Sequence, residues 1–174
     1  PLIERIRRAA AAGFDAVELH DDWRDCELSM IAEGLRETEL PMVSINTFMG
    51  DSVGLGALPG RDRDARTAID EAFEAAQALG ASAVHLVAGK ASGDAARNAY
   101  ASSLDHACRH APEGLVLLIE PLSSVTPGYF LDSLEAADEY LRSWPRLCLL
   151  FDCYHVAMSG HDPVSAFRAR QDRI

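Results

Sequence analysis

The stretch LLIEP at residues 117–121 has a counterpart further along the chain, LLFDC at residues 149–153. Each is an apolar run that ends on a carboxylate, Glu120 in the first and Asp152 in the second. A carboxylate at the end of a buried segment is poorly hydrated, and leaving it ionised and unpaired is costly. Both acids therefore need a cation, a hydrogen-bond network or a proton, and the fold must supply it.

The chain alternates short apolar runs with longer segments of helical spacing. The run LVLLI is apolar on both faces, as is typical of parallel strands that are covered by helices. Gly80 follows the clearest helical pattern at the position of a left-handed residue that ends a helix. The pattern predicts strands over 16–19, 42–46, 83–87, 115–120 and 147–152, and helices over 2–12, 27–38, 64–79, 94–110 and 132–143.

Two architectures agree with this alternation. An open doubly wound α/β sheet fits the length, but no glycine-rich phosphate loop follows any predicted strand. A (β/α)₈ TIM barrel needs about 250 residues and eight strands. On that fold the chain runs from the first helix to just past the sixth strand, and strands 1, 7 and 8 are missing. We predict the truncated barrel, as a single domain over residues 1–174 that is incomplete at both ends.

Composition restricts the partners. The net charge of −11 repels a phosphate backbone, which argues against nucleic acid as a substrate. No apolar stretch is long enough to cross a bilayer, and the start PLIERIRRAAAAGF lacks the apolar region of a signal peptide. The four cysteines show no metal-binding spacing and are expected to be reduced. These features predict a cytoplasmic protein that acts on a small molecule, away from membranes.

The predicted strands end in polar residues. They are Glu18 and His20, Asn46, Lys90 in the stretch AGK, Glu120, and Asp152 with His155. In both architectures ligands bind at the carboxyl ends of parallel strands. Glutamate, aspartate and imidazole ligands suit Mg²⁺ or Mn²⁺, with Zn²⁺ as a further option. The alternative is that each acid only caps the next helix or pairs with an arginine.

Two segments resemble a known family. LLIEPLSSVTPGYFL at 117–131 and LLFDCYHVAMSGHD at 149–162 are similar to the fifth and sixth strand segments of the xylose-isomerase-like TIM barrels, and among these to the hydroxypyruvate isomerase family. GFDAVEL at 13–19, ALPGRDRDAR at 57–66 and LVAGK at 86–90 support the resemblance, which covers nearly the whole chain.

The resemblance implies a metal-dependent isomerase of the aldose–ketose type. It assigns Glu120 to the metal and to proton exchange with substrate carbon, Asp152 to the metal, and His155 to the substrate oxygens. The implied reaction converts hydroxypyruvate to tartronate semialdehyde through an enediolate, and another small keto sugar is the alternative substrate. In this family the seventh and eighth strands add two more metal-site residues, including a second catalytic glutamate. This chain contains neither, so on its own we expect weak metal binding and poor catalysis.

A hydroxypyruvate site should offer positive charge to the substrate carboxylate. Lys90 is the single lysine of the chain and follows a predicted strand, and Arg61 lies in the long loop after another. We predict that both contact the carboxylate, although each fits an exposed surface cation equally well. Asn46 is predicted either to bind substrate or to cap its loop. An incomplete barrel also exposes strand edges, which favours self-association into a homo-oligomer.

Three rival functions follow from the same residues. Ketose 3-epimerases of this superfamily carry a second glutamate six residues after the strand-five acid, where this chain has Thr126. Apurinic endonucleases share the spacing of Asp152 and His155, but they bind zinc through histidines at strand ends that here carry Asn46 and Lys90. A catalytically inactive α/β binding module is the third.

Overall fold

The strands form one parallel sheet whose order follows the order of the chain. A computed structural model describes all residues from 1 to 174. The five strands are arranged β1-β2-β3-β4-β5, and every neighbouring pair is parallel. A doubly wound sheet reverses its strand order part-way, whereas a barrel adds each strand beside the last. The array is therefore of the TIM-barrel type. Its strands are β1 (Val17–Leu19), β2 (Met42–Asn46), β3 (Ala83–His85), β4 (Val116–Ile119) and β5 (Leu147–Leu149).

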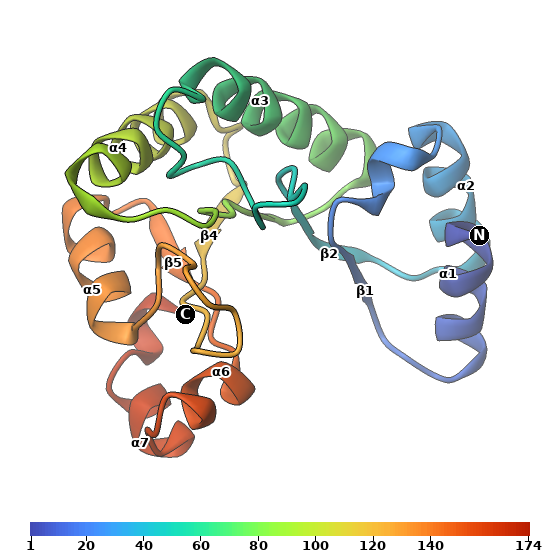
Figure 1. The fold of residues 1–174 in the computed structure, drawn as a ribbon. Helices are drawn as coiled ribbons and strands as arrows, with labels where there is room; N and C mark the ends of the chain where they lie inside the picture. The colour runs from blue at the N-terminus through green and yellow to red at the C-terminus, as the bar shows by residue number, and fades with distance from the viewer.

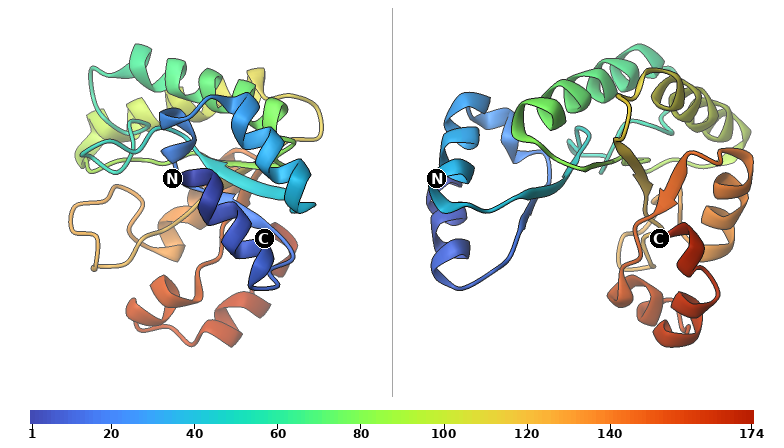
Figure 2. Two further views of the ribbon diagram at one scale, coloured as in Figure 1. Left: turned by 90° about the vertical axis from the view of Figure 1, so that its right-hand side faces the viewer. Right: turned by 180° about the vertical axis from the view of Figure 1, so that it is seen from behind.

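The helices lie on one side of this sheet. Figure 1 shows the strands as an arc with α1 to α5 along its outer side, and the view from behind in Figure 2 agrees. None of the helices is both long enough and apolar enough to span a bilayer. They are α1 (Leu2–Ala11), α2 (Leu28–Thr38), α3 (Asp62–Leu79), α4 (Gly93–His110), α5 (Leu134–Ser143), α6 (Cys153–Met158) and α7 (Pro163–Arg168), with 3₁₀ turns η1 (Asp22–Asp25) and η2 (Gln171–Arg173).

All five predicted strands and all five predicted helices are present, with shifted ends. The largest shift is in β5, which ends at Leu149 and not at residue 152. The reason is that Asp152 turns away from the ladder to cap α6. Gly80 ends α3 with φ of 68°, and its N–H is bonded to the carbonyls of Ala76 and Gln77, as predicted for a left-handed terminating residue.

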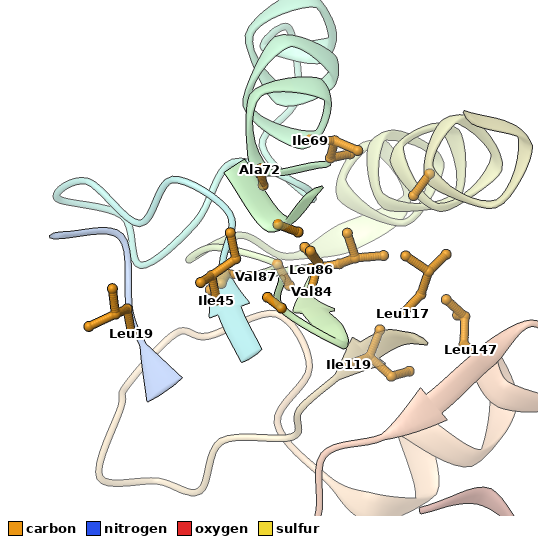
Figure 3. Close-up of a cluster of buried hydrophobic side chains, with 14 of the residues drawn as sticks. Leu19, Ile45, Ile69, Ala72, Val84, Leu86, Val87, Leu117, Ile119 and Leu147 are labelled. Atoms are coloured by element: carbon orange, nitrogen blue, oxygen red, sulfur yellow. The ribbon is translucent and has the colours of Figure 1, made fainter. Parts of the chain in front are cut away.

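A single row of aliphatic side chains joins the sheet to its helices. The register aligns one residue from each strand on the helix-facing side, and each of the five is buried (Figure 3). Ile69 and Ala72 of α3 lie over this layer. Burying one such aliphatic side chain stabilises the fold by roughly 1.5–3 kcal/mol. The row consists of Leu19, Ile45, Val84, Leu117 and Leu147.

The arc of strands does not close on itself. β1 pairs only with β2 and β5 only with β4, so each outer strand keeps one unpaired edge. On the concave side the sheet is partly open to solvent, and Val116 of β4 is 38% exposed. Side chains of alternate strand residues point to this side, and the polar residues at the strand ends continue it.

The loops at the carboxyl ends of β2, β3 and β4 are bonded to one another. Gly54 forms an antiparallel bridge with Ala88, and the N–H of Ala88 donates to the hydroxyl of Tyr129 at 2.9 Å. Gly54 and Gly89 have φ of 115° and 100°, and a Cβ on Gly89 would lie 2.5 Å from the Gly54 carbonyl oxygen. Only glycine fits this approach. The contact fixes the rim that surrounds the concave side.

We expect Gly89→Ala to destabilise the protein by more than about 3 kcal/mol, because the added methyl group meets backbone that cannot move alone. Gly60→Ala is the matched control: its φ is 77° and nothing lies within 4 Å of the added carbon, so only backbone strain of about 1 kcal/mol applies. Urea unfolding measures both. Equal losses in the two variants would show that the close approach is not a constraint.

Candidate metal centre and active site

Three side chains predicted from the sequence meet at the carboxyl end of the sheet. Glu120 directly follows β4, while Asp152 and His155 lie at the start of α6, which follows β5. The ligand atoms of the three residues all lie within 4.8 Å of one another. β4 and β5 are neighbours in the sheet, so two acids that are far apart in sequence become adjacent. This cluster is the centre of the candidate site.

Glu120 is held in an environment that disfavours its charge. Its side chain is only 13% exposed. Burial raises the pKa of Glu120 to about 8, and the negative charges of Asp152 and Glu18 act in the same direction. Without a cation, Glu120 therefore keeps its proton at neutral pH.

Asp152 has a structural role and a free oxygen. Its Oδ1 atom accepts a hydrogen bond of 2.7 Å from the backbone N–H of Tyr154, which makes it the N-cap of α6. The expectation that a strand-end acid caps the next helix thus holds for Asp152. Because the cap uses one carboxylate oxygen, the second oxygen remains available to the site.

His155 is oriented by Ser123, a residue of the loop after β4. The backbone N–H of Ser123 donates to Nδ1 of His155 at 3.1 Å, and the Ser123 hydroxyl lies 3.0 Å from the same nitrogen. A nitrogen that accepts a hydrogen bond carries no hydrogen, so in the neutral ring the hydrogen sits on Nε2. His155 is therefore arranged to donate from Nε2 and not to ligate a metal through it.

Two further residues, His85 and Glu18, complete the wall of the site. Nδ1 of His85, in β3, lies 3.8 Å from Oε2 of Glu120. Burial lowers the pKa of His85 to about 3, with the charge of His20 as a smaller cause, so the ring is neutral. Glu18 accepts a hydrogen bond from the Ser44 hydroxyl at 3.1 Å. The sequence marks Glu18 and His20 as strand-end residues, whereas His85 is hidden within an apolar strand.

The remaining predicted residues are not part of the cluster of Glu120, Asp152 and His155. Lys90 is exposed, and its backbone forms a bridge with Tyr129. Arg61 directly precedes α3 and forms an ion pair with Asp64. Asn46 is buried, and its side-chain amide donates to the sulfur of Met49 at 3.4 Å. Of these three, Lys90 is exposed and in no ion pair.

The donor set fits a divalent cation. Glu18, Glu120 and Asp152 bring carboxylate charge to one concave surface, and burial, with the charges of Asp152 and Glu18 as smaller causes, raises the pKa of Glu120. A divalent cation replaces that proton and relieves the repulsion. Glu120 and Asp152 each offer a carboxylate oxygen, which suits Mg²⁺ or Mn²⁺. The cluster can therefore hold a metal beside the histidine that donates from Nε2.

A parallel array in chain order, with acids at its carboxyl edge, defines a TIM-barrel-type protein with a carboxylate-lined site. The family model described as "Xylose isomerase-like TIM barrel" matches residues 6–174. The chain belongs to this family.

Similar proteins agree with this assignment. "Putative hydroxypyruvate isomerase" of Danio rerio is 36% identical over 170 residues, which cover 87% of this chain and 61% of that protein. "2-oxo-tetronate isomerase" of Pectobacterium atrosepticum is 34% identical, and the match covers 89% of this chain and 63% of that protein. The crystal structure of a family 2 AP endonuclease from Brucella melitensis has a TM-score of 0.92 at 30% identity, and covers 100% of this chain and 71% of that one. The chain thus spans about three fifths of the two relatives matched by sequence.

The raised pKa of Glu120 has a measurable effect on stability. Between its unfolded pKa near 4.5 and its folded pKa of about 8, the folded state binds more protons than the unfolded state. The free energy of unfolding therefore falls as pH rises through this window, by at most about 1.4 kcal/mol per pH unit. We expect Glu120→Gln to remove this part of the decline when urea unfolding is followed from pH 5 to pH 8 in the presence of a chelator.

The control for this experiment is Glu74→Gln, which changes an exposed glutamate of α3. It separates the effect of Glu120 from the loss of one negative charge in general. Parallel pH profiles for the wild type and Glu120→Gln would contradict the assignment.

Proposed function

We propose that the protein is a divalent-metal-dependent isomerase that converts hydroxypyruvate to tartronate semialdehyde. The observation that carries this proposal is the meeting of Glu120, Asp152 and His155 at the carboxyl ends of two adjacent strands. A carboxylate with a raised pKa beside a second acid is suited to proton exchange near neutral pH. The names of the two sequence relatives, both isomerases of small oxo acids, support the same reaction class.

Glu120 is the proposed proton carrier. Its carboxylate takes a proton from C3 of hydroxypyruvate as the C3–H bond breaks and the C2=C3 bond of an enediolate forms. It then returns that proton to C2, while the hydroxyl proton on C3 passes to the oxygen on C2 and the C3 aldehyde forms. The product has the same atoms as the substrate. One carboxylate serves both steps because C2 and C3 are neighbours.

His155 and Asp152 prepare the site for this transfer. The Nε2–H of His155 is free to donate to a substrate oxygen, since Ser123 occupies its other nitrogen. Asp152 and Glu120 are the proposed metal ligands, with Mg²⁺ or Mn²⁺ preferred and Zn²⁺ as the further option. When bound, the cation polarises the carbonyl and stabilises the negative charge of the enediolate.

Lys90 is the proposed partner of the substrate carboxylate. It lies on the rim and is in no ion pair, and its backbone is held beside Tyr129. Arg61 is a second proposed contact, weakened by its pairing with Asp64. Asn46 is a third, and to reach substrate its amide must leave the sulfur of Met49. A DNA substrate is disfavoured by the net charge of −11.

We expect Glu120→Gln to lower kcat for hydroxypyruvate by at least about 10²–10³ with Mn²⁺ present, because the amide cannot carry the proton. Asp152→Asn should weaken Mn²⁺ binding, and Glu74→Gln should change neither quantity. Formation of tartronate semialdehyde and calorimetric Mn²⁺ titration are the measurements. A wild-type protein that binds Mn²⁺ but isomerises neither hydroxypyruvate nor a small ketose would instead support the inactive binding module.

Substitution of Lys90 tests the substrate class. We expect Lys90→Met to raise KM for hydroxypyruvate by roughly tenfold, the effect of losing one charged hydrogen bond. KM for dihydroxyacetone, which has no carboxylate, should not change. Arg63→Met removes an exposed cation from α3 and is the control. Faster turnover of dihydroxyacetone or of a ketose epimer than of hydroxypyruvate would favour a sugar isomerase or a ketose 3-epimerase.

A further inference from the structure

His85 is placed where it can act on Glu120 without touching a substrate. It is in register with Asn46 of β2 and with Leu118 of β4, on the strand beside the one that ends at Glu120. Its side chain is 4% exposed, and Nδ1 lies 3.8 Å from Oε2 of Glu120. A buried imidazole in a strand has little freedom to move, so this orientation is fixed by the sheet.

The second nitrogen of the ring shows which tautomer is favoured. Nε2 of His85 is buried and has no hydrogen-bond partner. A hydrogen on Nε2 would bury an unpaired N–H and would also turn the lone pair of Nδ1 towards a carboxylate. A hydrogen on Nδ1 avoids both costs, since it points at Oε2. A charged ring also carries hydrogen on Nδ1, so the conclusion is the same for either protonation state.

We propose that His85 is a positioning residue whose Nδ1–H holds Oε2 of Glu120 and leaves the other carboxylate oxygen for the metal and the substrate. This inference rests on the proposed isomerase function and adds a residue to that site. The separation of 3.8 Å is longer than a hydrogen bond. A side-chain rotation of Glu120 that moves Oε2 by about 1 Å towards Nδ1 of His85 brings the two atoms into hydrogen-bond range.

A fixed ligand binds metal more tightly than a mobile one. The outer-shell hydrogen bonds of metal ligands contribute typically about 10–100-fold to metal affinity or activity. The negative charges of Asp152 and Glu18 also repel the charge of Glu120. An N–H donor to the Glu120 carboxylate opposes that repulsion. Loss of the donor should therefore reduce Mn²⁺ affinity and kcat together, with little effect on KM.

Three substitutions of His85 separate positioning from packing. His85→Leu fills the space without a donor, His85→Asn keeps an N–H close to the place of Nδ1, and His85→Gln carries its amide to the place of Nε2. Tyr100→Phe is the matched control, because the Tyr100 hydroxyl is also buried and unpartnered, but the Tyr100 ring packs against Phe130 and Tyr140 and not against Glu120. The dissociation constant for Mn²⁺ is measured by electron paramagnetic resonance of the free ion, and melting of the metal-free proteins reports on folding.

We expect Mn²⁺ affinity to fall about tenfold or more in His85→Leu and His85→Gln, and by less than about threefold in His85→Asn and Tyr100→Phe. If His85→Leu fails to fold, the comparison of His85→Asn with His85→Gln decides. Equal affinities in wild type, His85→Leu and His85→Gln, or equal losses in His85→Asn and His85→Gln, would overturn the positioning role and leave the proposed function intact. A wild-type protein without Mn²⁺ affinity would remove both.

Discussion

The burial of the Glu120 carboxylate beside two further acids, at one end of the sheet, is the constraint on which this site depends. Glu120 is almost enclosed, and this burial raises its pKa, with the negative charges of Asp152 and Glu18 as smaller causes. Left alone, like charges in a poorly hydrated space move apart or take up protons. Here the strands prevent separation, so protonation or a cation is the remaining solution. The proton on Glu120 and the proposed metal ion would compensate the same charge.

The two faces of the sheet have different roles. On the helix side, the aliphatic row from Leu19 to Leu147 packs against α3 and its neighbours, and this packing keeps the strands in register. On the concave side, polar groups collect where the strands end. The close approach of Gly54 and Gly89 binds the surrounding loops to each other. The rigid packing on the helix side thus keeps the like-charged groups on the concave side close together.

Much of this arrangement follows from sequence pattern, and the rest from contacts that no pattern encodes. Parallel strands place their carboxyl ends at one edge of the sheet, so Glu120 and Asp152 could be expected to lie close together. The hydrogen bond from Ser123 to His155 could not be expected from the sequence, because it joins a loop to a helix through a backbone N–H. His85 reads as part of an apolar strand, and only the register brings it beside Glu120. Arg61 and Asp64 are three residues apart, a spacing at which an ion pair can form on a helix, so their pairing could have been expected from the sequence.

Proton release on Mn²⁺ binding tests the central claim most directly. Calorimetric titration at pH 7 in buffers of different ionisation enthalpy counts the protons displaced by each ion. If burial and repulsion keep Glu120 protonated and the metal replaces that proton, the wild type will release about one proton per Mn²⁺ and Glu120→Gln will release none. Mn²⁺ binding without proton release, or equal release in both proteins, would contradict the account.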